Sequence, residues 1–67
     1  MYTYTQKCNA IINWAADKSD FNTHVVEGVL NRLAEGGQIS YSQEMAIENI
    51  LDGFQISIEK NLKDDEK

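Results

Sequence analysis

The chain of 67 residues has no proline, only one cysteine and no long run of apolar residues. The absence of proline favours helices, because proline interrupts a helix interior. The single cysteine, Cys8, excludes an internal disulfide and suits a reducing compartment. No apolar run approaches the ~18–20 residues of a membrane span, and no basic segment precedes an apolar one. We therefore expect a cytoplasmic protein with no membrane contact and no signal peptide.

Positive charge is also scarce, and no lysine or arginine occurs between Arg32 and Lys60. The formal net charge of the whole chain is −5. Residues 17–59 carry eight acids against Lys18 and Arg32, a net of −6, and the acids are Asp17, Asp20, Glu27, Glu35, Glu44, Glu48, Asp52 and Glu59. Such a surface repels a phosphate backbone and attracts a basic protein surface. The alternative is that the acidic balance only aids solubility.

The spacing of apolar residues predicts an all-α fold, a small bundle of three main helices with a possible fourth segment at the C-terminal end. We expect the first helix over residues 4–17. The second is expected to begin after Asn22 as N-cap, with Phe21 and Val26 as a hydrophobic staple, and to end at Gly36-Gly37. Gly28 within it would allow another backbone to approach closely. The third is expected to begin after Ser40 and to run to about Asp52.

Residues 54–60 fit two patterns. Leu51, Phe54, Ile58 and Leu62 continue a helical spacing, whereas Phe54, Ile56 and Ile58 alternate with polar residues as in a strand. A terminal strand could pair with residues 2–5, whose aromatic and β-branched residues also alternate. We favour a short fourth helix, because a lone strand pair is weak in water. Residues 1–62 are then a single helical domain, and residues 63–67 a charged tail that we expect to be frayed.

The third helix carries the clearest candidate binding surface. Glu44, Glu48 and Asp52 recur at i, i+4 and i+8, and we call them the acidic ridge. Two like-charge pairs cost about 0.2–0.5 kcal/mol each in an isolated helix, and Asp52 lies where the helix dipole disfavours an anion. No local cation neutralises the ridge, so we expect it to contact a partner, helped by Tyr41 and by Glu27 and Glu35 on the second helix. One alternative is imitation of nucleic-acid phosphates, which would need further acids nearby, such as Glu27 and Glu35. The other is an ordinary solvated face.

Catalytic and metal-binding patterns are weak. Cys8 lies on the apolar stripe of the first helix and is expected to be a small buried hydrophobe, which disfavours a catalytic dyad with His24. The spacing of Asp17, Asp20 and His24 matches no zinc or calcium pattern. Gly36-Gly37 is not followed by lysine and suits a helix end better than a phosphate cradle. We therefore expect no enzyme activity, metal or cofactor.

The second and third helices also allow a helix-turn-helix interpretation. The third helix would then enter the major groove, where it would present the acidic ridge to a polyanion without one lysine or arginine. Direct nucleic-acid binding is accordingly disfavoured.

Part of the chain resembles a short helical segment that recurs in uncharacterised phage proteins. Its pattern begins with an apolar residue and a tryptophan, followed by a phenylalanine, an apolar helix and a glycine turn. After the turn come Leu or Ile, Ser or Thr, two further residues, Gln, and Ala. The resemblance covers a little over half of the chain and rests on Ile11, Trp14, Phe21, Val29, Leu30, Gly37, Ile39, Ser40, Gln43, Ala46 and Ile47. It implies a phage origin and action inside a bacterial host. Small acidic phage proteins often inhibit host proteins, including defence proteins.

These observations together predict a small acidic protein-binding module, an inhibitor of a host protein with a basic surface. The first alternative is a structural protein that forms homo-oligomers, since a core this small leaves stability marginal. The second alternative is a nucleic-acid-binding helix-turn-helix protein.

Overall fold

The computed structural model describes residues 2–62 of the chain, and these residues contain four helices. They are α1 (Tyr4–Ala15), α2 (His24–Ala34), α3 (Tyr41–Gly53) and α4 (Ile58–Leu62). The expected all-α bundle of three main helices and a short fourth is confirmed. The expected charged tail, residues 63–67, lies outside the described residues. No helix in the described part is long and apolar enough to cross a membrane.

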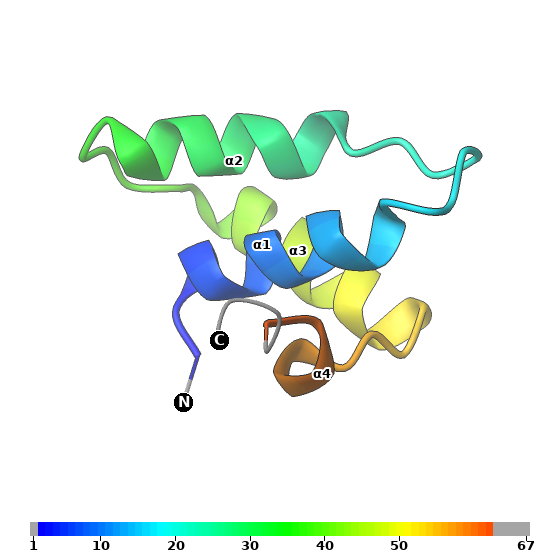
Figure 1. Cartoon of the computed structure of the whole chain (residues 1–67). Helices are drawn as coiled ribbons and strands as arrows, with labels where there is room; N and C mark the ends of the chain where they lie inside the picture. Colours follow the sequence, from blue (N-terminus) through cyan, green and yellow to red (C-terminus); the bar gives the residue numbers. More distant parts are fainter. Residues whose placement is uncertain (1, 63–67) are drawn as a thin grey trace.

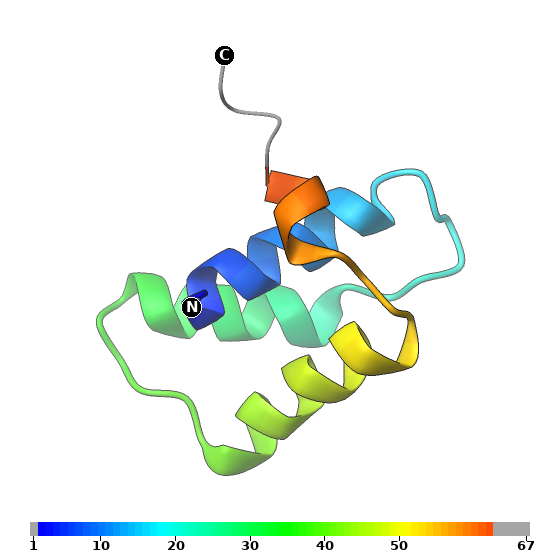
Figure 2. The same cartoon turned by 90° about the horizontal axis from the view of Figure 1, so that it is seen from below.

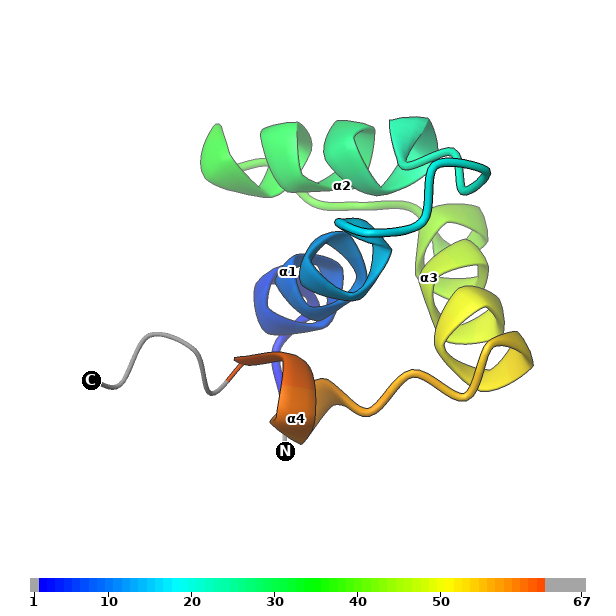
Figure 3. The same ribbon diagram turned by 45° about the vertical axis from the view of Figure 1, so that its right-hand side comes forward.

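Helix α1 is the centre of the fold and contacts each of the other three helices (Figures 1 and 3). In Figure 3, α2 lies above α1, α3 beside it and α4 below it. Figure 2 shows α4 crossing the later part of α1, where the side-chain amide of Asn13 donates a hydrogen bond of 2.7 Å to the carbonyl of Asn61. The core between the helices is apolar and consists of Cys8, Ile11, Val26, Val29, Ile47, Leu51 and Ile56.

Two helices begin at capping boxes. At the start of α3, the Ser40 hydroxyl accepts the backbone N–H of Gln43, and the Gln43 side chain accepts the N–H of Ser40, as the sequence predicts. Thr3 and Gln6 form the same reciprocal pair at α1. Residues 2–5 therefore begin a helix, and the alternative terminal strand is wrong, since residues 2–62 contain no strand.

The start of α2 differs from the prediction by one residue. Thr23 is the N-cap, and Asn22 stands just before it, where its side-chain oxygen accepts the N–H of His24 at 2.8 Å. The shift removes Phe21 from the staple position, and Phe21 instead packs against two other aromatic rings. Helix α1 likewise ends at Ala15 rather than at residue 17. No other group lies within 4 Å of a side chain built at Gly28, so the expected close backbone approach is absent.

Helices α2 and α3 end in the same way, in Schellman motifs. After α2, the N–H of Gly37 bonds to the carbonyl of Arg32, and Gly36 has a φ of 84°. After α3, the N–H of Ile56 bonds to the carbonyl of Leu51, but the left-handed position is held by Gln55, with a φ of 53°. Ile56 and Leu51 are both buried, and this apolar contact is a usual companion of the motif. The turn thus directs Ile56 toward the core and allows α4 to begin.

Replacing Gln55 with glycine is expected to raise the free energy of unfolding by about 0.5–1 kcal/mol. A side chain in the left-handed region costs about 1–2 kcal/mol, and the greater freedom of glycine in the unfolded chain offsets part of the gain. The reverse change, Gly36→Ala, should lower stability by a similar amount. Urea denaturation followed by circular dichroism measures both, and a destabilised Gln55→Gly variant would contradict this account of the turn.

Candidate functional site

The acidic ridge follows one flank of α3, beside the buried stripe that contains Ile47 and Leu51. The structure places Glu44 and Glu48 as half-buried residues, whereas Asp52 is exposed. Glu44 lies close enough to Tyr4 of α1 to contribute to the raised pKa of its phenol. The ridge therefore borders α1 rather than projecting wholly into solvent.

Glu48, at the centre of the ridge, is engaged within the molecule. Its Oε2 atom accepts a hydrogen bond of 2.9 Å from the Tyr4 hydroxyl and a second from the Lys7 ammonium, with which it forms an ion pair. The bonds from Lys7 and Tyr4 hold the pKa of the Glu48 carboxyl below its usual value. Conversely, the bond to Glu48 raises the pKa of Tyr4 to about 12.

The sequence contains no cation near the ridge, as noted above, but a distant lysine neutralises its central acid. Lys7 lies 41 residues away in the sequence, and the packing of α1 against α3 brings it to the ridge. The positive charge of Lys7 thus offsets part of the repulsion between the carboxylates of the ridge.

Of the other predicted residues of α3, Tyr41 and Asp52 are exposed and Glu44 is half-buried. Tyr41, the first residue of the helix, is the most exposed large hydrophobic side chain among the described residues, at 75%. Met45, one turn further along, is also exposed. Together with Glu44 and Asp52 they form what we call the outer face of α3, which combines an exposed aromatic ring, a flexible thioether and two carboxylates.

Glu27 lies on α2 and Glu35 directly follows it, and among residues 2–62 neither forms a hydrogen bond or ion pair with the acidic ridge. Glu27 is exposed and accepts a 2.8 Å hydrogen bond from the hydroxyl of Thr23, which belongs to its own helix start. Glu35 is exposed and is the C-cap of the helix. Both are solvent-facing charges outside the buried stripe of α2.

Cys8 and His24 occupy opposite environments. Cys8 is fully buried in the core, as expected, and burial raises the pKa of its thiol to about 11, which disfavours a thiolate. His24 is exposed at the first position of α2. Among residues 2–62, no three histidine, cysteine, aspartate or glutamate side chains gather where they could hold a metal ion. Asp17, Asp20 and His24 are thus not assembled into a metal site.

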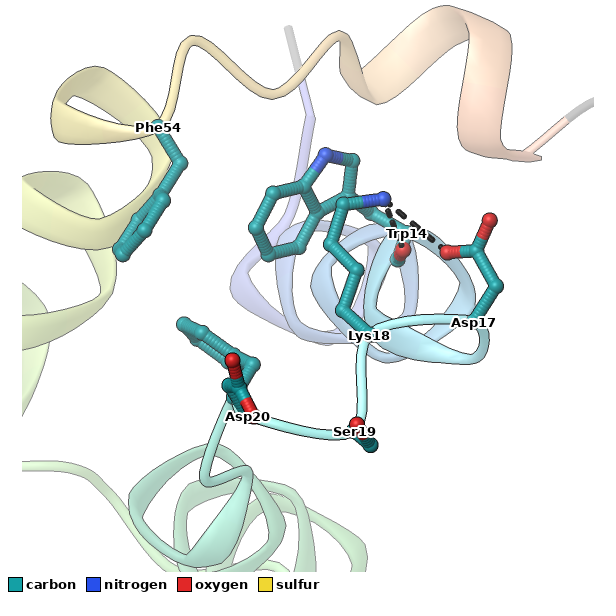
Figure 4. A pocket seen from close by; sticks show the side chains of 7 residues that line it. Trp14, Asp17, Lys18, Ser19, Asp20 and Phe54 are labelled. Carbon is teal, nitrogen blue, oxygen red and sulfur yellow. Dashed lines mark hydrogen bonds and ion pairs between the residues drawn. The ribbon is translucent and has the colours of Figure 1, made fainter.

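Sequence reasoning missed an open cleft where α1, the loop after it and the end of α3 meet. It has a volume of about 550 Å³ and is lined by Trp14, Asp17, Lys18, Ser19, Asp20, Phe21 and Phe54 (Figure 4). We call it the aromatic cleft. The rings of Trp14, Phe21 and Phe54 form a triangle with centroid separations of 5.2–5.3 Å. Phe21 makes edge-to-face contacts with the other two rings, an arrangement that is favourable, yet Phe54 remains 53% exposed.

Lys18 lies on one wall of the aromatic cleft. Its ammonium nitrogen is 4.5 Å from the centroid of the Trp14 ring and donates a 3.0 Å bond to Asp17 and a 3.2 Å bond to the Trp14 carbonyl (Figure 4). The bond from Lys18 also holds the pKa of the Asp17 carboxyl below its usual value. The cleft therefore combines a cation, the aromatic face that attracts it and the carboxylate that pairs with it.

No protein-family model, no curated protein and no solved structure matches the chain.

Proposed function

We propose that this chain is a non-enzymatic protein-binding module whose contact surface is the outer face of α3. The observation that carries the proposal is the exposure of Tyr41, 75% of whose surface is open to solvent beside Glu44 and Met45. Tyrosine is enriched at the energetic centres of protein interfaces, because it offers a large ring and a polar tip. The capping box at Ser40 and Gln43 fixes the backbone at Tyr41, so the backbone there need not be ordered on binding.

The partner is a protein with a basic surface. The chain carries a net charge of −5, and opposite charge speeds association at low salt. Glu44 and Asp52 supply the carboxylates of the contact, because Glu48 is already paired with Lys7. Glu27 and Glu35 add long-range attraction from α2. A nucleic acid is not the partner, because α3 contains no lysine or arginine.

We further propose that the module is phage-encoded and inhibits a protein in the cytoplasm of the bacterial host. Two observations support this step, namely the resemblance to small phage helical proteins and the acidic character of the chain. A host protein that handles nucleic acid, in defence or in processing, has the basic surface that an acidic inhibitor would cover.

A second candidate, the homo-oligomer, is favoured by the exposure of Val25 on α2, at 52%. Light scattering over a dilution series distinguishes the two. A constant monomer mass supports the partner-binding module, whereas a mass that rises with concentration supports self-association through apolar surface.

The proposed function is tested by comparing Tyr41→Ala with the wild type as immobilised bait in a bacterial lysate, with Val25→Ala as a matched control. We expect a protein that the wild type and Val25→Ala retain at low salt, that Tyr41→Ala loses, and that elutes as salt is raised. Loss of one aromatic anchor should weaken the affinity about tenfold or more. A partner retained equally by all three baits would place the contact elsewhere.

A further inference from the structure

We propose that the aromatic cleft is a binding site for an arginine side chain of a partner polypeptide, and that Lys18 covers the Trp14 face of the cleft in the free protein. This inference does not depend on the outer face of α3, because the cleft is built from other residues. Its walls are the rings of Trp14, Phe21 and Phe54, and its rim carries Asp17 and Asp20.

The position of Lys18 shows which chemistry the site attracts. Its ammonium lies over the Trp14 ring at 4.5 Å and pairs with Asp17 at 3.0 Å. A cation over an aromatic face is drawn by the ring's quadrupole, and the carboxylate beside it neutralises its charge. The side chain of Lys18 is 40% exposed and that of Asp17 84% exposed, so an incoming cation can displace Lys18 at low cost.

Arginine is the cation that gains most from this exchange. A lysine would replace one ammonium by another and gain little. A guanidinium is planar, is less strongly hydrated, stacks on an aromatic ring and can donate two parallel bonds to one carboxylate. It would stack on Trp14 and bond to Asp17, while its aliphatic stem lies along Phe54, a residue that is 53% exposed at the opposite side of the cleft (Figure 4). Asp20 adds a second negative charge at the rim.

Lys18 also makes the site selective among incoming side chains. Its ammonium competes with weak or uncharged side chains for the Trp14 face, so only a group that stacks better than an ammonium replaces it. Removing Lys18 should therefore tighten binding of arginine, whereas removing a cation elsewhere on the surface should not.

The test uses the intrinsic fluorescence of Trp14, which is the only tryptophan in the chain. The probe is N-acetyl-arginine amide, and the controls are the uncharged citrulline analogue and the lysine analogue. We expect a saturable fluorescence change with the arginine probe, a weaker one with lysine and none with citrulline. Proton NMR of the aromatic rings supplies a second measurement, in which the Trp14, Phe21 and Phe54 resonances shift and those of Tyr41 do not.

Two charge-matched variants test the role of Lys18. Lys18→Gln should bind the arginine probe about two- to fivefold more tightly, the factor that corresponds to one exposed cation–π contact. Lys60→Gln, at an exposed position of α4, should bind as the wild type does. Asp17→Asn should weaken binding. Equal binding of arginine and citrulline, equal binding of arginine and lysine, or no difference between Lys18→Gln and Lys60→Gln would each overturn the inference.

Discussion

Replacing Ile11 with alanine is expected to lower the free energy of unfolding by about 2–5 kcal/mol. Ile11 is fully buried near the middle of α1, the helix that contacts all three others. The substitution removes apolar contact area and leaves a cavity that α2, α3 and α4 can fill only in part. A chain of this length has a total stability of only about 3–10 kcal/mol, so the substitution should remove a large part of the free energy of unfolding.

Urea denaturation followed by circular dichroism measures this effect. Val25→Ala is the matched control, since Val25 also carries a branched apolar side chain but is 52% exposed on α2. Its stability should lie within about 0.5 kcal/mol of the wild type. Equal destabilisation by the two substitutions would show that the core does not lie where α1 meets the other helices.

Replacing Glu48 with glutamine is expected to lower the free energy of unfolding by about 1–2 kcal/mol. The carboxylate accepts bonds from both Tyr4 and Lys7, and charged hydrogen bonds contribute about 1.5–3 kcal/mol each when buried. The Glu48 side chain is 40% exposed, so solvent screening reduces that sum. The Lys7 side chain is only 17% exposed, and in Glu48→Gln its ammonium would lose the negative charge that offsets the cost of its burial.

The same pair predicts a dependence on pH. Because the folded pKa of Glu48 is lowered, the unfolded chain binds more protons in acid than the folded one does. The contribution of Glu48 is therefore complete above the unfolded pKa, whose ordinary value is 4.5, and is lost as the pH falls through the folded pKa. In Glu48→Gln this loss should be absent from the curve of stability against pH.

Glu44→Gln and Asp52→Asn are the controls for this prediction. Neither change removes an ion pair among the described residues. Asp52→Asn relieves repulsion along the acidic ridge and removes an anion from the end of α3, so stability should stay the same or rise by a few tenths of a kcal/mol. Glu44→Gln relieves repulsion but removes a favourable anion from the first turn of α3, so stability should stay within about 0.5 kcal/mol of the wild type. If the three substitutions had the same effect, Glu48 would not be the structural member of the ridge.

Local signals in the sequence predicted most of the fold. The capping interactions of Ser40 with Gln43 and of the glycines after α2 join residues close together in the sequence. They could therefore be predicted without knowledge of how the helices pack. Thr3 and Gln6 carry the same capping signal, which the aromatic alternation of residues 2–5 obscured. Gln55 shows the limit of local reasoning, because a glutamine in a left-handed turn is set by the burial of Ile56 and Leu51 rather than by its own preference.

The candidate sites depended on contacts between helices, which periodicity alone does not reveal. The positions of Glu44, Glu48 and Asp52 on one flank of α3 followed from their spacing. The pairing of Glu48 with Lys7 did not, because it joins residues 41 positions apart. The aromatic cleft likewise joins Trp14, Phe21 and Phe54 from three segments. The positions of Phe21 and Phe54 could have indicated the cleft, because each lies beside the end of a helix, where an apolar ring needs another side chain to pack against.

We propose that the acids of α3 have separate roles, with Glu48 holding the fold while Glu44 and Asp52 meet a partner. The most direct measurement is the affinity, at low salt, of the captured partner for the double variant Glu44→Gln/Asp52→Asn, with Glu27→Gln/Glu35→Gln for comparison. We predict that the α3 variant keeps wild-type stability, binds several-fold more weakly and shows a smaller salt dependence, and that the α2 variant changes less. Undiminished binding by the α3 variant would contradict the account.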